Sequence, residues 1–274
     1  MRTSGRGVAV TAPAMPAPAP ERTAGWWAVS DALVLARRNL LHYLRVPSLV
    51  VFSVVSPVMF VLLFAFVFGG AISVPGLRYV DYLMGGILVQ TVAFGSTETG
   101  VGLADDLSHG KIDRFRALPT ARSAVLAGRA LADTIRHAFM VLLMTGVGLL
   151  IGFRAHGGPV RAALALLLVL AFGFALSWVS AAIGLAVQDV EATQMAGVIW
   201  TFPVTFTSSA FVRVDSMPGW LQAWAHVNPI TVTVDAVRNL LLGRPAGADV
   251  AQALLWTVAI LAVFVPLAVR RYRV

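Results

Sequence analysis

The sequence predicts an all-α integral membrane protein with six membrane-spanning helices, and three observations support this fold class. First, 58% of the 274 residues are apolar and 12% are charged, whereas a soluble domain has about 45–50% and about 25%. Second, six stretches reach the ~20 largely apolar residues that a spanning helix needs. Third, the cations concentrate in the segments between alternate stretches, which is typical of a polytopic membrane protein.

The N-terminal 46 residues lie outside the six stretches and divide into two parts. Residues 1–25 are rich in Pro, Ala, Thr and Gly and contain no apolar run of signal-peptide type, so we expect a disordered cytoplasmic tail. Residues 26–46 place Asp31, Arg38 and Arg45 on one helical face and apolar side chains opposite. This pattern predicts an amphipathic elbow helix that lies in the plane of the membrane interface.

The six apolar stretches are the predicted spans of a transmembrane domain that covers residues 47–274. They run at about 49–71, 81–102, 131–153, 162–187, 194–212 and 251–269. The second and fifth are less apolar than the others, because several Thr, Ser, Gln and Glu residues interrupt them. Pro57, Pro203 and Pro266 fall inside spans, where neighbouring helices satisfy the carbonyls that proline leaves unpaired.

The cations indicate the orientation of the chain. Fifteen of the 21 Lys and Arg residues precede the first span, lie around the link between the second and third, or follow the last. The other six lie in the remaining segments: Arg78, Arg154, Arg161, Arg213, Arg238 and Arg244. Because cations favour the cytoplasmic side, we expect both termini in the cytoplasm of a bacterial cell. The net charge of +8 therefore reflects membrane orientation, and we expect no nucleic-acid partner.

The link between the second and third spans has the composition of a docking surface. It alternates charged residues with apolar ones and ends at a proline, so that an apolar centre is surrounded by a charged rim. Its candidate contact residues are Asp105, Asp106, Gly110, Lys111, Arg114, Phe115, Arg116, Leu118 and Pro119. The alternative is a solvated connector between two helices.

The external segment between the fifth and sixth spans is too apolar for a free loop. Pro218 starts a short helix, and Asn228-Pro229 ends it and starts a second one that reaches Gly243. We expect two re-entrant helices that enter the outer leaflet and return; the alternative is a hairpin lying flat in the interface. The residues that define the segment are Pro218, Trp220, Trp224, Asn228, Pro229, Asp235 and Arg238, of which the last two are spaced to form an ion pair.

Polar side chains within the second and fifth spans are candidates for a transport pathway. Gln90 and Thr97 are seven residues apart, as are Thr91 and Glu98, so the second span has two adjacent polar stripes. Intramembrane acids are costly and often mark a pathway, but Glu98 lies near the cytoplasmic end, where exposure to water or helix pairing is an equal alternative. With residues of the fifth span, the candidate set is Gln90, Thr91, Thr97, Glu98, Phe202, Thr205 and Phe206.

Chemistry of the usual catalytic kinds is absent from the sequence. There is no cysteine, which excludes disulfides and thiolate chemistry, and neither metal-ligand spacing nor a G-x-S-x-G motif is present. A Walker A loop needs G-x-x-x-x-G-K-[ST], but the single lysine, Lys111, is followed by Ile112. We therefore expect no catalytic residue, metal or cofactor in this chain.

Two stretches resemble the permease subunits of ABC-2-type exporters, in particular the daunorubicin-resistance-like branch. They are DDLSHGKIDRFRALPTARSAVLAGRALAD (105–133) and MPGWLQAWAHVNPITVTVDAVRNLLLG (217–243). The resemblance implies a coupling helix at about 105–119 that docks on a separate nucleotide-binding subunit, re-entrant helices at about 218–242, and an elbow helix at 26–45. It also implies a pair of permeases with two ATPase subunits, in which ATP and Mg²⁺ bind the partner. Arg213 departs from the family pattern, where we expect an apolar residue or proline.

These inferences together predict a permease subunit of an ATP-driven exporter. Its substrate is expected to be a hydrophobic small molecule, either drug-like or antibiotic-like or a lipid, which leaves through a cavity between two permeases in contact with membrane lipid. Three other classes remain alternatives: an ion-coupled secondary transporter, an integral membrane enzyme, and a membrane assembly component that does not transport. A secondary transporter would need buried titratable groups in several spans, and an enzyme would need a catalytic cluster.

Overall fold

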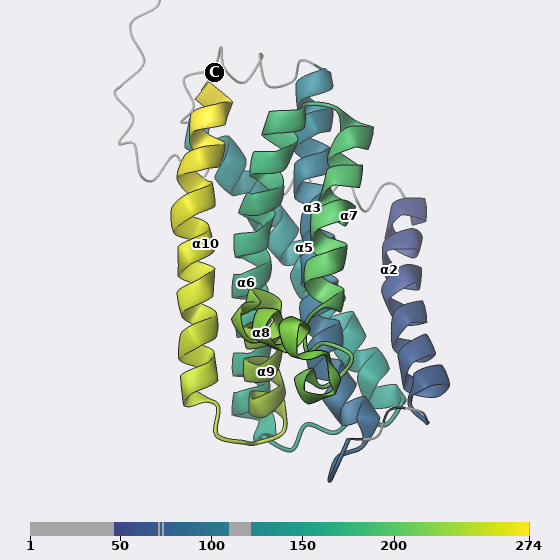
Figure 1. The fold of residues 1–274 in the computed structure, drawn as a ribbon. Coiled ribbons are helices and arrows are strands. Elements are labelled where there is room, and N and C mark those ends of the chain that lie inside the picture. Colours follow the sequence, from purple (N-terminus) through teal and green to yellow (C-terminus); the bar gives the residue numbers. More distant parts are fainter. Residues whose placement is uncertain (1–46, 71, 73, 110–121, 274) are drawn as a thin grey trace, which may run out of the picture.

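The computed structural model describes residues 47–70, 72, 74–109 and 122–273, and within these it is a bundle of long helices (Figure 1). The elements are α2 (Pro47–Leu62), η1 (Leu63–Phe68), α3 (Tyr79–Ser108), α5 (Arg122–Leu150), α6 (Gly158–Val187), α7 (Val190–Phe206), η2 (Val214–Ser216), α8 (Gly219–Val227), α9 (Pro229–Leu241) and α10 (Gly247–Arg273). The predicted tail (1–25), the predicted elbow helix (26–46) and residues 110–119 of the predicted coupling helix lie outside the described residues.

Helix α3 occupies the centre of the bundle. Helices α5, α6, α7 and α9 pack against it, while α2 and α10 stand at opposite sides (Figure 1). Twenty of the 30 residues of α3 are buried. A helix surrounded by protein does not need an apolar, lipid-facing side, so it can carry more glycine and polar residues than a peripheral helix.

Three helices of the described part of the chain are long and apolar enough to cross a membrane. These spans are Arg129–Leu150 in α5, Gly158–Val187 in α6 and Gly247–Arg271 in α10. The apolar part of the first predicted span, Pro57–Phe68, is shorter. Helices are present at all six predicted positions, but length and composition identify three of them as spans, and the six-span topology stays a prediction.

The helix ends differ from the predicted ends at two places. Helix α7 stops at Phe206 instead of continuing to residue 212. Thr207 is its C-cap, and the chain after it is held against α3 by the Tyr79 and Tyr82 hydroxyls, which donate to the Phe211 and Ser209 carbonyls. Helix α5 begins at Arg122, well before the predicted start at 131. Its first turns are polar, so hydropathy does not detect them.

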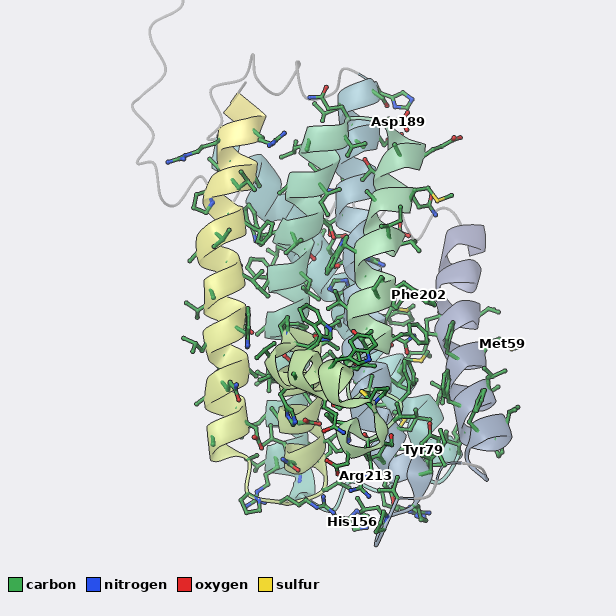
Figure 2. The ribbon with its side chains drawn as sticks, in the orientation of Figure 1. Met59, Tyr79, His156, Asp189, Phe202 and Arg213 are labelled. Carbon is green, nitrogen blue, oxygen red and sulfur yellow. The ribbon has the colours of Figure 1, made fainter. Side chains whose placement is uncertain are left out.

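The loops gather at two ends of the bundle. The C-terminus, the start of α5 and the α6–α7 turn at Asp189 lie at one end, and His156 lies at the other (Figures 1 and 2). At the second end the Gly157 amide donates to the Leu241 carbonyl over 2.9 Å and Arg161 donates to the Gly243 carbonyl. Arg161 and Arg78, two of the cations predicted to be external, thus lie at the end of the bundle that carries the α5–α6 and α9–α10 links.

Candidate functional site

An ion pair connects α3 to α5 at the end of the bundle that carries the C-terminus. Arg129 on α5 donates to the Asp106 carboxylate over 2.6 Å, and both side chains are largely buried. Gly102 makes room for this contact, because a side chain there would meet the Arg129 guanidinium. Asp105 lies 3.2 Å from the His109 imidazole in the last turn of α3. The start of the predicted docking segment is therefore bound to the bundle through Asp106.

Further polar contacts between α3 and α5 extend toward the middle of the bundle. The Thr99 hydroxyl donates to the Asp133 carboxylate over 2.6 Å, and Arg136 donates to the Gly95 carbonyl over 2.6 Å. His137 is fully buried, and its ring packs against Gly95 and against Gly173 of α6. Sequence reasoning did not select Asp133, Arg136 or His137. The polar contacts join α3 and α5 into one hairpin.

The predicted pathway residues on α3 do not share one environment. Gln90, Thr91 and Thr97 are buried, whereas Glu98 is exposed. Thr91 donates its hydroxyl to the Ile87 carbonyl of its own helix over 2.8 Å. Thr97 instead packs directly against Gly197 of α7.

The pathway residues on α7 lie on two different faces. Thr205 is completely buried. Phe206 and Phe202 stack on each other with centroids 4.2 Å apart, and Phe206 stacks on Phe211 at 5.1 Å. Phe64 of η1 completes this aromatic cluster at 4.3 Å from Phe211. The phenylalanines thus face α2 and η1, and Phe202 is about half exposed there (Figure 2).

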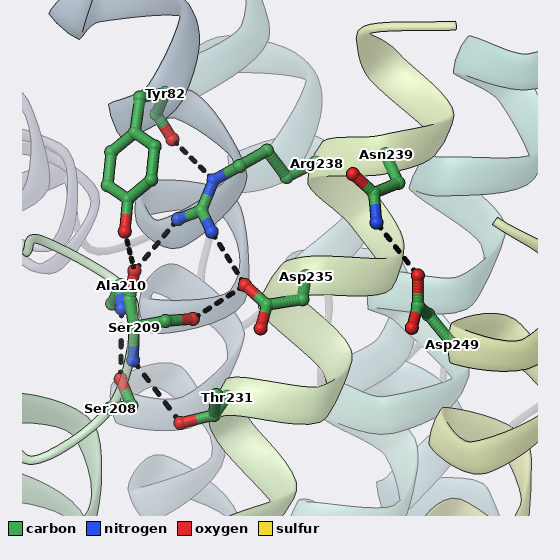
Figure 3. A network of polar contacts seen from close by, with 9 residues as sticks. All are labelled: Tyr82, Ser208, Ser209, Ala210, Thr231, Asp235, Arg238, Asn239 and Asp249. Carbon is green, nitrogen blue, oxygen red and sulfur yellow. Dashed lines mark hydrogen bonds and ion pairs between the residues drawn. The ribbon is translucent and has the colours of Figure 1, made fainter. Parts of the chain in front are cut away.

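A polar network fixes α9 against α3 and the 208–211 segment (Figure 3). Its centre is Arg238 of α9, whose side chain is 7% exposed. Arg238 donates to the Tyr82 carbonyl over 3.0 Å, to the Ser209 carbonyl over 2.8 Å and to the Asp235 carboxylate over 2.6 Å. The guanidinium also lies 3.7 Å from the centroid of the Tyr82 ring, a cation–π contact. The predicted Asp235–Arg238 pair is therefore present within a larger network.

Other hydrogen bonds of the network hold the 208–211 segment in place. The Tyr82 hydroxyl donates to the Ser209 carbonyl over 2.9 Å, and the Ser209 hydroxyl donates to Asp235 over 2.8 Å. The Thr231 hydroxyl oxygen accepts a hydrogen bond from the Ser209 backbone amide. Gly86 permits the close approach, because a side chain there would collide with the Ala210 backbone. Sequence spacing identified the ion pair, but Tyr82 and Ser209 come from distant segments with no local signal.

The short helices α8 and α9 have the ends that the sequence predicts. Pro218 precedes α8, and Asn228 caps α9 by accepting the Ile230 amide, with Pro229 in the first turn. The Asn228 amide also donates to the Val204 carbonyl, which ties the start of α9 to α7. Trp220 and Trp224 are 75% and 45% exposed. Beside this segment, Arg213 pairs with Asp215 at 2.6 Å, next to the turn η2.

The described residues contain no group of three or more His, Asp or Glu side chains that could hold a metal ion. What they bring together is a set of helix contacts. α3 and α5 are linked by an ion pair and hydrogen bonds, α3 and α9 by the Arg238 network, and α3 and α7 by closely packed glycine and threonine. Packed helix interfaces of this kind switch between discrete arrangements instead of deforming smoothly.

Comparison with known proteins gives similarity across most of the chain. The family model described as ABC-2 type transporter matches residues 31–242. The chain is 36% identical over 253 residues to the daunorubicin resistance ABC transporter permease protein DrrB1 of Streptomyces coeruleorubidus, covering 92% of this chain and 89% of the relative. It is 26% identical over 249 residues to the probable doxorubicin resistance ABC transporter permease protein DrrC of Mycobacterium tuberculosis, with 88% of each covered.

Proposed function

The chain belongs to the ABC-2 type transporter family, and we propose from this premise that it is the permease subunit of an ATP-driven exporter of hydrophobic small molecules. The observation that carries the proposal is the 36% identity to a drug-resistance permease over 92% of the chain. The relatives are named for resistance to daunorubicin and doxorubicin, so a drug-like substrate is the first to test. A lipid substrate is the second.

The energy for transport comes from a separate nucleotide-binding subunit. The sequence has no Walker A loop to bind the phosphates of ATP. A nucleotide-binding partner docks on residues 105–119, and its closure on ATP pushes this segment. Because an ion pair and a hydrogen bond join α3 to α5 close to the segment, a push there moves the two helices together as a rigid hairpin.

The proposed assembly contains two permeases and two ATPase subunits in the cytoplasmic membrane. Six spans place both termini and the docking segment in the cytoplasm, and α8 and α9 in the outer leaflet. The separation of the loops to two ends of the bundle supports this arrangement (Figure 1), as does the concentration of 15 of the 21 cations near the predicted cytoplasmic side.

Charge reversal in the docking segment is expected to weaken assembly with the ATPase. In the variant R114E/R116E, or with Phe115→Ala, we expect co-purification of the nucleotide-binding subunit to fall by about tenfold, since few residues dominate such interfaces. The measurement is the ratio of the two subunits after affinity purification of the permease. The matched control is R270E/R271E, which reverses two exposed arginines at the same end of the bundle; an equal loss there would contradict a specific docking role.

Transport itself is tested in inside-out vesicles that contain both subunits. Daunorubicin is the first cargo, by analogy with the named relative. ATP-dependent uptake that persists when an uncoupler collapses the proton gradient supports the proposal. Uptake that stops with the gradient while ATP stays high would instead support an ion-coupled transporter. Transport or ATP hydrolysis by the permease without a second polypeptide would contradict the proposal that a separate subunit supplies the energy.

A further inference from the structure

Three threonine hydroxyls of α7 are buried and have no hydrogen-bond partner. Thr193, Thr201 and Thr205 are 1%, 0% and 0% exposed, and none of their hydroxyl oxygens has a partner among the described residues. A buried hydroxyl without a partner is unfavourable by about 1–3 kcal/mol. Other buried helical threonines avoid this state by bonding their own helix, as Thr257 does with the Ala253 carbonyl.

The three threonines and Gly197 follow one another at intervals of four residues, so they form one stripe along α7. This stripe faces α3. Thr193 lies beside Gly100, and Gly197 packs on Thr97. The two helices run in opposite directions, so higher residue numbers on α7 lie opposite lower residue numbers on α3. By this register Thr205 lies at the level of Gln90. Gln90 is buried and is two turns from Thr97 on the same face of α3. The α3–α7 interface therefore contains a row of buried polar groups, made of the threonine stripe of α7 and Gln90 of α3; we call this row the lane.

Helix α7 is held to α3 differently from the other neighbours of α3. An ion pair and side-chain hydrogen bonds join α3 to α5, and the Arg238 network joins it to α9. Along 190–206, in contrast, the described residues show no side-chain hydrogen bond or ion pair between α7 and α3. The opposite face of α7 is exposed, with Met195 and Ile199 at 65% and 70%. Separation of α7 from α3 thus breaks packing contacts but no side-chain hydrogen bond or ion pair among the described residues.

We propose that α7 separates from α3 during transport and that its threonine stripe, with Gln90 of α3, then binds hydrogen-bonding groups of the cargo. This inference rests on the proposed function. Pro203 sits near the C-terminal end of α7, where it removes one helical hydrogen bond. That position is a suitable hinge, because Val204, which follows it, is anchored to α9 through Asn228. The part of α7 before Pro203 therefore moves with Thr193 and Thr201, while Thr205 stays at the fixed end, at the level of Gln90.

The lane also defines the class of cargo. Hydroxyls and an amide donate and accept hydrogen bonds but carry no charge, and no ionised side chain belongs to the stripe. An ionic group bound there would lose its hydration without a counter-charge. The cargo therefore presents neutral hydroxyl or carbonyl groups to α7, while its apolar part contacts the neighbouring phenylalanines, such as Phe206.

The test combines a change in the protein with a change in the cargo. The variant T201V/T205V removes two hydroxyls and keeps the side-chain shape. The cargoes are 1-pyrenebutanol, a neutral fluorescent molecule with one hydroxyl, and 1-butylpyrene, which lacks it. In vesicles with the ATPase subunit, we expect the native complex to export pyrenebutanol with a KM about threefold to tenfold lower than that of butylpyrene. The variant is expected to lose this difference.

Stability distinguishes this role from a structural one. Because the two hydroxyls are unpaired in the structure, T201V/T205V is expected to unfold at the same temperature as the native chain or higher. Thr257→Val is the control: its hydroxyl is paired within α10, so we expect native discrimination between the cargoes.

The inference is overturned if T201V/T205V keeps the native preference for pyrenebutanol over butylpyrene, or if the native complex shows no such preference. A lower unfolding temperature for T201V/T205V would also overturn it, because the hydroxyls would then be paired. If the native complex exports neither cargo when supplied with ATP, the proposed function does not hold for these molecules, and the inference that rests on it fails as well.

Discussion

Replacing Arg238 by methionine is expected to lower the free energy of unfolding by about 2–4 kcal/mol, because this buried side chain donates to two carbonyls and to Asp235, whose own side chain is 40% exposed. Methionine keeps much of the side-chain volume but none of the donors. The Tyr82 carbonyl then loses the donor that Arg238 supplies, and Asp235 loses its counter-charge. The measurement is thermal or denaturant unfolding of the purified protein in lipid nanodiscs.

A second arginine provides a matched control. Arg213 also pairs with an aspartate at 2.6 Å, but the two side chains are 41% and 75% exposed. Arg213→Met is therefore expected to change stability by less than about 1 kcal/mol. If the two variants unfolded alike, burial would not explain the importance of the network. Arg238→Lys should fall between them, since lysine keeps the charge but not the planar fork of donors.

The Arg238 network matters beyond stability because of what it holds. Through Ser209 it fixes the segment that leaves the end of α7, and through Tyr82 it attaches this segment to α3. The anchor gives α7 a fixed end. Loss of Arg238 is thus expected to reduce transport more than assembly with the ATPase, since Asp105 and Asp106, where the docking segment begins, lie at the other end of α3 from Tyr82.

Hydropathy and helix-end signals predicted where the helices lie, because they depend on neighbouring residues. Asn228-Pro229 and Gly243 mark the ends of α9 in the structure as they do in the sequence. Hydropathy did not detect the amphipathic first turns of α5. It also counts α3 as weakly apolar, since burial by other helices, not by lipid, decides its composition.

The candidate site was less predictable, because its contacts join distant segments. The spacing of Asp235 and Arg238 suggested a pair, yet nothing local points to Tyr82, 156 residues away from Arg238. The pathway candidates were chosen for polarity in an apolar span. Polarity alone could not show that Thr91 bonds its own helix whereas Thr205 has no partner. Such distinctions require the packing of α7 on α3.

A close backbone contact between α3 and α6 gives the second large prediction. Gly184 of α6 lies against the backbone of Gly100 of α3, and a side chain on either one would collide with backbone atoms of the other helix. Gly184→Ala must push α3 and α6 apart along a large interface, because backbone cannot move aside as a flexible side chain does. We expect a loss of about 1–3 kcal/mol in the free energy of unfolding, measured as for Arg238→Met.

Gly146→Ala separates this packing effect from helix propensity. Gly146 is in α5, and no heavy atom lies within 4 Å of where its side chain would be. Alanine there is expected to stabilise the helix by roughly 0.5–1 kcal/mol, since it removes the entropic cost of glycine. Opposite signs for the two substitutions would show that close α3–α6 contact, and not flexibility, explains the glycine at 184. Equal signs would contradict that contact, and with it the placement of α3 at the centre of the bundle.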